Sequence, residues 1–244
     1  MSDLPAPAPQ PGMTSGQGGL RELSPAYFGL VMATGIVSLV ADMLGWPLLA
    51  HALLALNAVQ YLVLWGLYLL RAWRYPRRFF GDMVEHARGA GYFTMVAATG
   101  IMASQCIVML DNLGLGFALW ALAALLWLLV TYTIFTAFTV GRDKVMLDKG
   151  ISGAWLLAVV STQALAVCSA LLAARIGQPL RLELNLLALS MWLWGGMLYI
   201  WMMALIFYRY LFFPFSPGDL SPPYWINMGA MAISTLAGSL LILN

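Results

Sequence analysis

The sequence predicts an all-α polytopic membrane protein built from tandem transmembrane helical hairpins. Three observations carry this prediction. The 244 residues are 62% hydrophobic and only 9% charged, with a mean hydropathy of +0.84, whereas about a quarter of the residues in a soluble domain are charged. Seven apolar runs are each long enough to cross a bilayer. A ten-residue pattern also recurs along the chain, which indicates a repeat architecture.

The repeat is clearest between residues 27–36 and 92–101. These segments share Tyr, Phe, Val, Ala, Thr, Gly and Ile in register, at an offset of 65 residues. Fainter copies begin at Trp155 and at Tyr224. Each copy opens an odd-numbered apolar run, so the sequence predicts quasi-equivalent odd helices that alternate with even helices of a different kind.

The chain begins with a polar segment and continues as one transmembrane domain over residues 24–244. Residues 1–23 are expected to form a disordered cytoplasmic tail, because they are rich in Pro, Gly, Ser and Gln and lack the apolar core of a signal peptide. Ser24 is a suitable N-cap and Pro25 suits the first helical position. The predicted spans are 25–44, 48–70, 91–110, 113–140, 151–174, 184–213 and 222–243.

The connections differ in character. Tight turns at 45–47 and 111–112 lie within the first and second hairpins and join their two helices. The segment that connects these two hairpins, residues 71–90, contains five arginines. We expect this basic segment to be a solvated loop, with a short helix on the membrane surface as the alternative.

The sixth span is long and is expected to extend past the membrane or to kink near Gly195 and Gly196. Because Asn244 follows the fourth odd span directly, we expect a truncated reading frame or a fragment.

The distribution of basic residues predicts the orientation. Ten of the 12 Lys and Arg residues fall on the N-terminal side of the membrane, and only Arg175 and Arg181 fall on the other. The positive-inside rule therefore predicts a cytoplasmic N-terminus. We expect a multi-pass protein of the plasma (cell inner) membrane. The net charge of +2 is too small to indicate a nucleic-acid partner.

Several function classes lose support from the motifs. Cys106 and Cys168 lie in apolar runs without C-x-x-C spacing, so we expect small buried side chains and no disulfide or metal pair. His51 and His86 lack any H-E-x-x-H partner and are expected to be structural or solvated. Neither a Walker loop nor a G-x-S-x-G motif occurs. The sequence therefore predicts no enzyme, no metal and no cofactor.

The odd spans are rich in small and hydroxyl-bearing residues. Such residues permit close packing of helices in a membrane, or they line a common polar path, and their repetition favours the path for the set as a whole. The predicted path residues are Thr34, Gly35, Ser38, Thr99, Gly100, Ser104, Thr162, Asn227 and Gly229. Lys, Arg and Glu are absent from the middle of the spans, which disfavours a proton relay. Helix N-termini and basic loops on the inner side favour anions.

Three segments carry a resemblance to a known family. They are Ser24-Pro25-Ala26-Tyr27-Phe28 with Ala33-Thr34-Gly35-Ile36, residues 155–163, and residues 224–233. They resemble the tellurite-resistance/dicarboxylate transporter family, which includes fungal malic acid transporters, sulfite efflux pumps and slow anion channels of plants. The resemblance implies ten helices in five hairpins, of which seven are present here. It further implies an inner pore ring of odd helices, an outer ring of even helices, a homotrimer, and a pore-blocking phenylalanine on the ninth helix.

The expected function is transmembrane transport of small anions, with C4-dicarboxylates such as malate as the class that the resemblance implies. The partners are then the anion and the lipid bilayer. One alternative is a non-transporting scaffold or receptor subunit, whose functional surface would be the basic segment 71–90. A non-functional remnant is the other.

Overall fold

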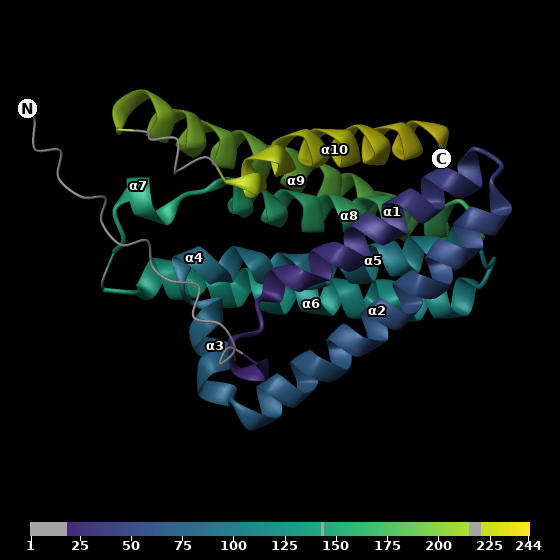
Figure 1. Ribbon diagram of the computed structural model, residues 1–244. Helices are drawn as coiled ribbons and strands as arrows, with labels where there is room; N and C mark the ends of the chain where they lie inside the picture. The colour runs from purple at the N-terminus through teal and green to yellow at the C-terminus, as the bar shows by residue number, and fades with distance from the viewer. Residues whose placement is uncertain (1–18, 143, 215–220) are drawn as a thin grey trace, which may run out of the picture.

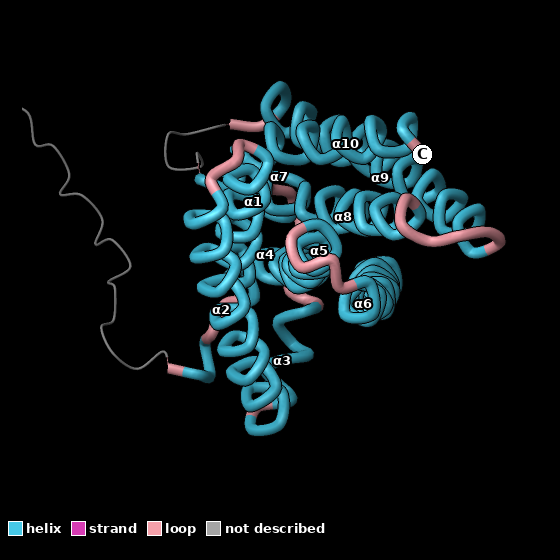
Figure 2. Tube along the Cα trace, turned by 90° about the vertical axis from the view of Figure 1, so that its right-hand side faces the viewer, coloured by secondary structure: helices cyan, strands magenta, loops and turns pink. Residues whose placement is uncertain are grey.

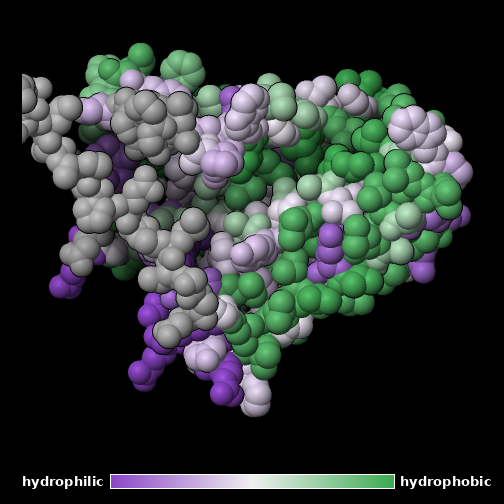
Figure 3. Space-filling model, viewed as in Figure 1, coloured by the Kyte–Doolittle hydropathy of each residue, from purple (hydrophilic) through white to green (hydrophobic). Residues whose placement is uncertain are grey.

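The computed structural model describes residues 19–142, 144–214 and 221–244, and the regular structure within them is helical. Seven helices in these ranges are long and apolar enough to cross a membrane, which confirms the predicted fold class. They are Pro25–Met43, Pro47–Arg74, His86–Val108, Leu113–Val140, Gly153–Ala173, Leu180–Phe212 and Pro222–Leu243. Hydrophobic residues cover the helices, and hydrophilic ones gather at the end that carries the short helix α3 (Pro76–Met83) (Figure 3).

The sequence repeat corresponds to a repeated local structure. The odd spans each enter the membrane through a 3-10 turn that continues as an α-helix, and the repeated aromatic residues lie at this junction. The pairs are η2 (Pro25–Phe28) with α1 (Gly29–Met43), η3 (Ala90–Tyr92) with α5 (Phe93–Val108), η4 (Gly153–Trp155) with α8 (Leu156–Ala173), and η6 (Pro222–Trp225) with α10 (Ile226–Leu243). The even spans α2 (Pro47–Arg74), α6 (Leu113–Val140) and α9 (Leu180–Phe212) are single α-helices.

The odd helices form an arc in the order α1, α5, α8, α10, in which each packs against the next (Figures 1 and 2). The even helices α2, α6 and α9 pack against the odd helix of their own hairpin. The core therefore lies around α5 and α8, whose residues are almost all buried. Because α1 and α10 end the arc, each packs against only one other odd helix and keeps much of its surface exposed.

The sixth span is one unbroken α-helix across Gly195 and Gly196. A Cβ atom at Gly195 would lie 2.5 Å from Nε2 of Gln163 on α8, whereas Gly196 faces open space. Gln163 Nε2 donates to the carbonyl oxygen of Trp192 at 3.1 Å. Gly195 thus allows the buried Gln163 side chain to lie directly against the α9 backbone.

The expectation of a solvated loop over 71–90 is wrong. Helix α2 continues to Arg74, and the short helices α3 (Pro76–Met83) and α4 (His86–Gly89) follow it. The reason is a buried ion pair between Arg71 and Asp82, which holds α3 against the end of α2. The 3-10 turn η1 (Leu20–Glu22) falls within residues 1–23, the predicted tail, whose disorder stays a prediction. Residues 1–18 of that tail lie outside the described residues.

Candidate functional site

The concave arrangement of the four odd helices is the candidate site. Neighbouring helices pack along the arc, but no comparable packing joins α1 to α10 among the described residues. Both end helices keep exposed stripes along their length, which on α1 include Leu30, Val37 and Val40, and on α10 include Met228 and Leu236. The arc is therefore open on the side between α1 and α10.

Two of the predicted path glycines lie where helices cross. A Cβ atom at Gly35 would collide with Ile101 and would lie 2.8 Å from Asn57 Nδ2. A Cβ atom at Gly100 would lie 3.2 Å from the Cβ of Ala164 on α8. These glycines bring α1 close to α2 and α5, and α5 close to α8, in the manner of small residues at membrane helix interfaces.

The two predicted path serines also meet neighbouring helices. Ser38 Oγ donates to the Ala50 carbonyl oxygen at 2.9 Å, which links α1 to α2. Ser104 Oγ donates to the Gly100 carbonyl oxygen at 3.0 Å and lies 3.1 Å from Cys168 Sγ on α8. Cys168 is a free, buried thiol, as is Cys106, in agreement with their prediction as small buried side chains.

Three further path residues accept hydrogen bonds from aromatic side chains of the even helices. Tyr61 of α2 donates to Thr99 Oγ1 at 3.1 Å, Trp127 of α6 to Thr162 Oγ1 at 2.8 Å, and Tyr199 of α9 to Asn227 Oδ1 at 2.8 Å. Each donor lies on the even helix that immediately precedes the acceptor's helix in the chain. These bonds therefore tie each hairpin to the next one.

Thr34 and Gly229 differ from the other seven. Thr34 is half-buried, and its hydroxyl has no hydrogen bond within the described part of the chain. Gly229 is exposed, and a Cβ atom there would meet nothing within 4 Å. They lie on α1 and α10, the two helices that border the open side of the arc. That any of the nine residues lines a path stays a prediction.

A polar stripe on α2 escaped the sequence-based prediction. Asn57, Tyr61, Tyr68 and Arg71 are all buried and follow alternating spacings of three and four residues if Leu64 is included. This spacing places them on one face of a helix. Asn57 Nδ2 donates to Gln105 Oε1 of α5 at 2.7 Å. The regular spacing was the signal in the sequence that could have revealed this buried face.

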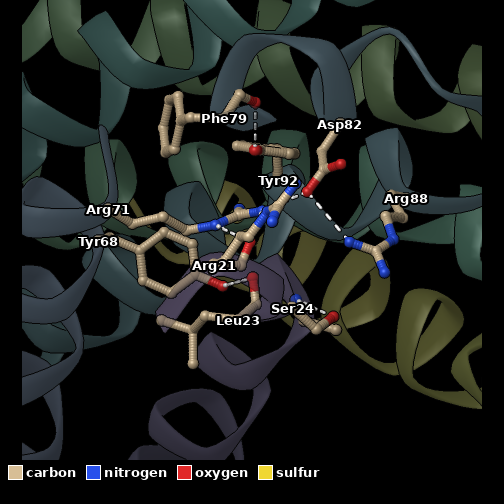
Figure 4. Close-up of polar contacts among 10 residues, drawn as sticks. Arg21, Leu23, Ser24, Tyr68, Arg71, Phe79, Asp82, Arg88 and Tyr92 are labelled. Atoms are coloured by element: carbon tan, nitrogen blue, oxygen red, sulfur yellow. Dashed lines mark hydrogen bonds and ion pairs between the residues drawn. The ribbon is translucent and has the colours of Figure 1, made fainter. Parts of the chain in front are cut away.

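Arg71 organises a buried polar cluster at the end of α2 (Figure 4). Its guanidinium pairs with Asp82 and donates to the Arg21 carbonyl oxygen from Nε at 3.3 Å and from Nη2 at 3.1 Å. Arg88 Nη1 reaches the same Asp82 carboxylate at 3.2 Å. Tyr92 OH donates to the Phe79 carbonyl oxygen at 2.7 Å. The cluster fixes η1, α3 and the entry to α5 around two guanidinium groups and one carboxylate.

The histidines have ordinary surroundings. His51 Nδ1 lies 2.8 Å from the Pro47 carbonyl oxygen. The His86 ring stacks on Phe138 at a centroid distance of 3.9 Å. Among the described residues, His, Cys, Asp and Glu form no group of three or more that could hold a metal ion.

Comparison with known proteins assigns the chain to a family. The model of the family SLAC1, described as voltage-dependent anion channel, matches residues 22–243, which confirms the relationship predicted from the sequence. An uncharacterized transporter of Methanocaldococcus jannaschii is 21% identical over 227 residues, which cover 89% of this chain and 65% of that protein. An uncharacterized membrane protein of Mycobacterium tuberculosis H37Rv is 47% identical over 45 residues, 18% of this chain and 23% of that protein. The chain thus spans about two thirds of the length of the first relative.

Proposed function

Because the chain belongs to the voltage-dependent anion channel family, we propose that it takes part in the passage of small anions across the membrane. The observation that carries this proposal is the arc of four odd helices with equivalent 3-10 entries, of which α5, α8 and α10 are each hydrogen-bonded to the preceding hairpin. Neighbouring helices that run in the same direction and pack side by side in an arc are suited to line a common path.

The proposed path runs along the concave side of the arc, bordered by Thr34 of α1 and Gly229 of α10. The free hydroxyl of Thr34 could donate a hydrogen bond to a partly dehydrated anion, and the absence of a side chain at Gly229 leaves room for it. The other seven predicted residues would act indirectly, by setting the spacing of the helices that carry the path. This division follows from the interhelical contacts of those seven residues.

The electrostatic arrangement supports anions as the substrate class. With the N-terminus in the cytoplasm of a cell-membrane protein, the four odd helices point the positive ends of their dipoles toward the inner mouth. Most basic residues lie on the same side, which raises the local concentration of anions there.

C4-dicarboxylates such as malate are the substrates that the resemblance to malic acid transporters suggests. A homotrimer is the assembly that the same resemblance suggests.

A bulky residue at Gly229 tests the path. The full-length protein is reconstituted into liposomes, and uptake of radiolabelled malate and of chloride is measured for the wild type and for Gly229→Leu. We expect the substitution to reduce flux severalfold, because it would add a large side chain to the proposed path. Gly66→Leu is the matched control, since Gly66 is also an exposed helical glycine with nothing within 4 Å of a Cβ atom, but it lies on the even helix α2.

Three results would be decisive. Loss of flux in Gly229→Leu alone supports the path. Equal flux in all three proteins, with Gly229→Leu as stable as the wild type, contradicts the assignment of the concave side. No flux of either anion through the wild type favours the non-transporting scaffold.

A further inference from the structure

A groove of about 790 Å³ lies between the even helices α6 and α9. Its walls are mainly large apolar and aromatic side chains, among them Trp127, Tyr132 and Phe135 of α6 and Trp194, Leu198 and Trp201 of α9. The volume lies within the range of sites that bind small molecules, about 300–1,000 Å³. The groove is on the outer side of the arc, away from the proposed anion path, so the inference below does not rest on that proposal.

The groove has the length of a single acyl chain. On α6 it extends from Trp127, in the middle of the helix, to Val140, the last helical residue. Thirteen residues of α-helix correspond to about 20 Å, which compares with about 15 Å for half of the hydrocarbon core of a bilayer. The groove therefore follows one leaflet, the leaflet at the end of the molecule where α6 ends.

A cation lies at that end of the groove. Lys144 Nζ donates to the carbonyl oxygen of Thr139, a groove residue, at 3.0 Å, and also to the carbonyl oxygen of Phe138. Arg142, two residues earlier in the chain, is also exposed. Residues 141–150, which follow the last groove residue of α6 in the chain, contain three basic and two acidic residues, so this segment has a net positive charge. Basic pockets between transmembrane helices are a known form of lipid recognition.

We propose that this groove binds a phospholipid with an anionic headgroup. One acyl chain would lie between α6 and α9, and the phosphate would meet Lys144 and Arg142. A phospholipid matches both the apolar wall and the cationic end, whereas the apolar face of another helix would leave the ammonium group of Lys144 without a counter-charge. The indole and phenol groups of the walls are suited to such an amphipathic ligand.

The test is lipid retention. The full-length protein is purified from nanodiscs containing phosphatidylglycerol and phosphatidylcholine with identical acyl chains, and bound lipids are counted by native mass spectrometry. We expect the wild type to retain phosphatidylglycerol preferentially. Arg142→Gln with Lys144→Gln should weaken retention of phosphatidylglycerol by roughly fivefold for each cation removed. Thr136→Trp should lower retention of both lipids, because Thr136 lines the groove.

Matched controls separate the groove from the general surface. Thr133→Trp adds the same side chain at an exposed position of α6 that does not line the groove, and Arg77→Gln with Arg78→Gln removes two exposed cations from α3. Retention like the wild type in both controls, with loss in both groove variants, supports the proposal.

Two outcomes would overturn it. One is unchanged lipid retention in Thr136→Trp and in the Arg142→Gln, Lys144→Gln variant. The other is efficient disulfide cross-linking of Thr136→Cys between two copies in the membrane, which would make the groove a subunit interface.

Discussion

The indole Nε1 of Trp127 donates a 2.8 Å hydrogen bond to Oγ1 of Thr162 and so joins the even helix α6 to the odd helix α8. Thr162 lies seven residues after Trp155, just as Thr99 lies seven residues after Tyr92. Tyr61 donates to Thr99 in the same way at 3.1 Å. The sequence repeat is therefore accompanied by a repeated bond between successive hairpins.

A second tier of bonds lies further along the same helices. Asn57 donates to Gln105 at 2.7 Å, Trp120 to Ser169 at 2.8 Å, and Trp192 to the Ser234 carbonyl oxygen at 2.9 Å. In each case the donor is again on an even helix and the acceptor on the next odd helix. Because neighbouring hairpins are bonded at two levels along their helices, these bonds restrict both sliding and tilting of one hairpin relative to the next.

The first prediction concerns the hydrogen bond between Trp127 and Thr162. Trp127→Phe removes the donor while keeping a ring in place, and we expect it to lower the free energy of unfolding by about 1 kcal/mol. A double-mutant cycle with Thr162→Val, measured by denaturant titration in detergent, should return most of that value as coupling. Trp73→Phe is the control, because Trp73 is 82% exposed. Zero coupling would show that the bond does not hold the hairpins together.

The second prediction concerns the buried cluster at the end of α2. Asp82→Ala leaves the fully buried Arg71 guanidinium without its counter-charge, and the expected loss is about 3–5 kcal/mol of unfolding free energy. The double variant Arg71→Met, Asp82→Leu should be more stable than Asp82→Ala, because it removes both charges. Glu85→Ala, at an exposed position, should change stability little. A loss in Asp82→Ala as small as that in Glu85→Ala would contradict the importance of the pair.

The third prediction concerns the close approach of two 3-10 turns. A Cβ atom at Gly153 of η4 would lie 2.6 Å from the carbonyl oxygen of Pro223 and from the backbone of Tyr224 in η6. Because backbone atoms cannot move aside cheaply, Gly153→Ala should destabilise the protein by about 1–3 kcal/mol. Gly66→Ala, where the space is open, should be neutral or stabilising by up to about 1 kcal/mol. Thermal unfolding of both variants checks this, and similar melting temperatures would refute it.

The fourth prediction compares two equivalent threonines. Thr99 accepts a hydrogen bond from Tyr61, whereas Thr34 has no such partner in the described residues. Thr99→Val should therefore lower stability by about 1 kcal/mol, and Thr34→Val should leave it unchanged. If Thr34 borders the anion path as proposed, Thr34→Val should alter anion flux at wild-type stability. A stability loss in Thr34→Val equal to that in Thr99→Val would argue for a structural role instead.

Much of the architecture was predictable because it depends on local properties of the chain. Seven apolar runs, their turns and the recurring aromatic motif predict seven spans in hairpins with equivalent odd helices, and the structure has them. The segment 71–90 was not predictable in this way. Its arginines suggest a solvated loop, but burial of Arg71 depends on Asp82, eleven residues away, and no local pattern marks that pairing.

The sequence by itself determined the membrane class, the family, the number of spans and the distinction between odd and even helices, because hydropathy and the repeat are properties of the chain alone. Only the tertiary structure decided which face of each odd helix meets which neighbour. Thr34 and Thr99 occupy the same position in the same motif, yet only Thr99 lies against Tyr61 of another hairpin. A small polar residue suits a helix contact and a polar path equally well, and its neighbours in space are what distinguish the two.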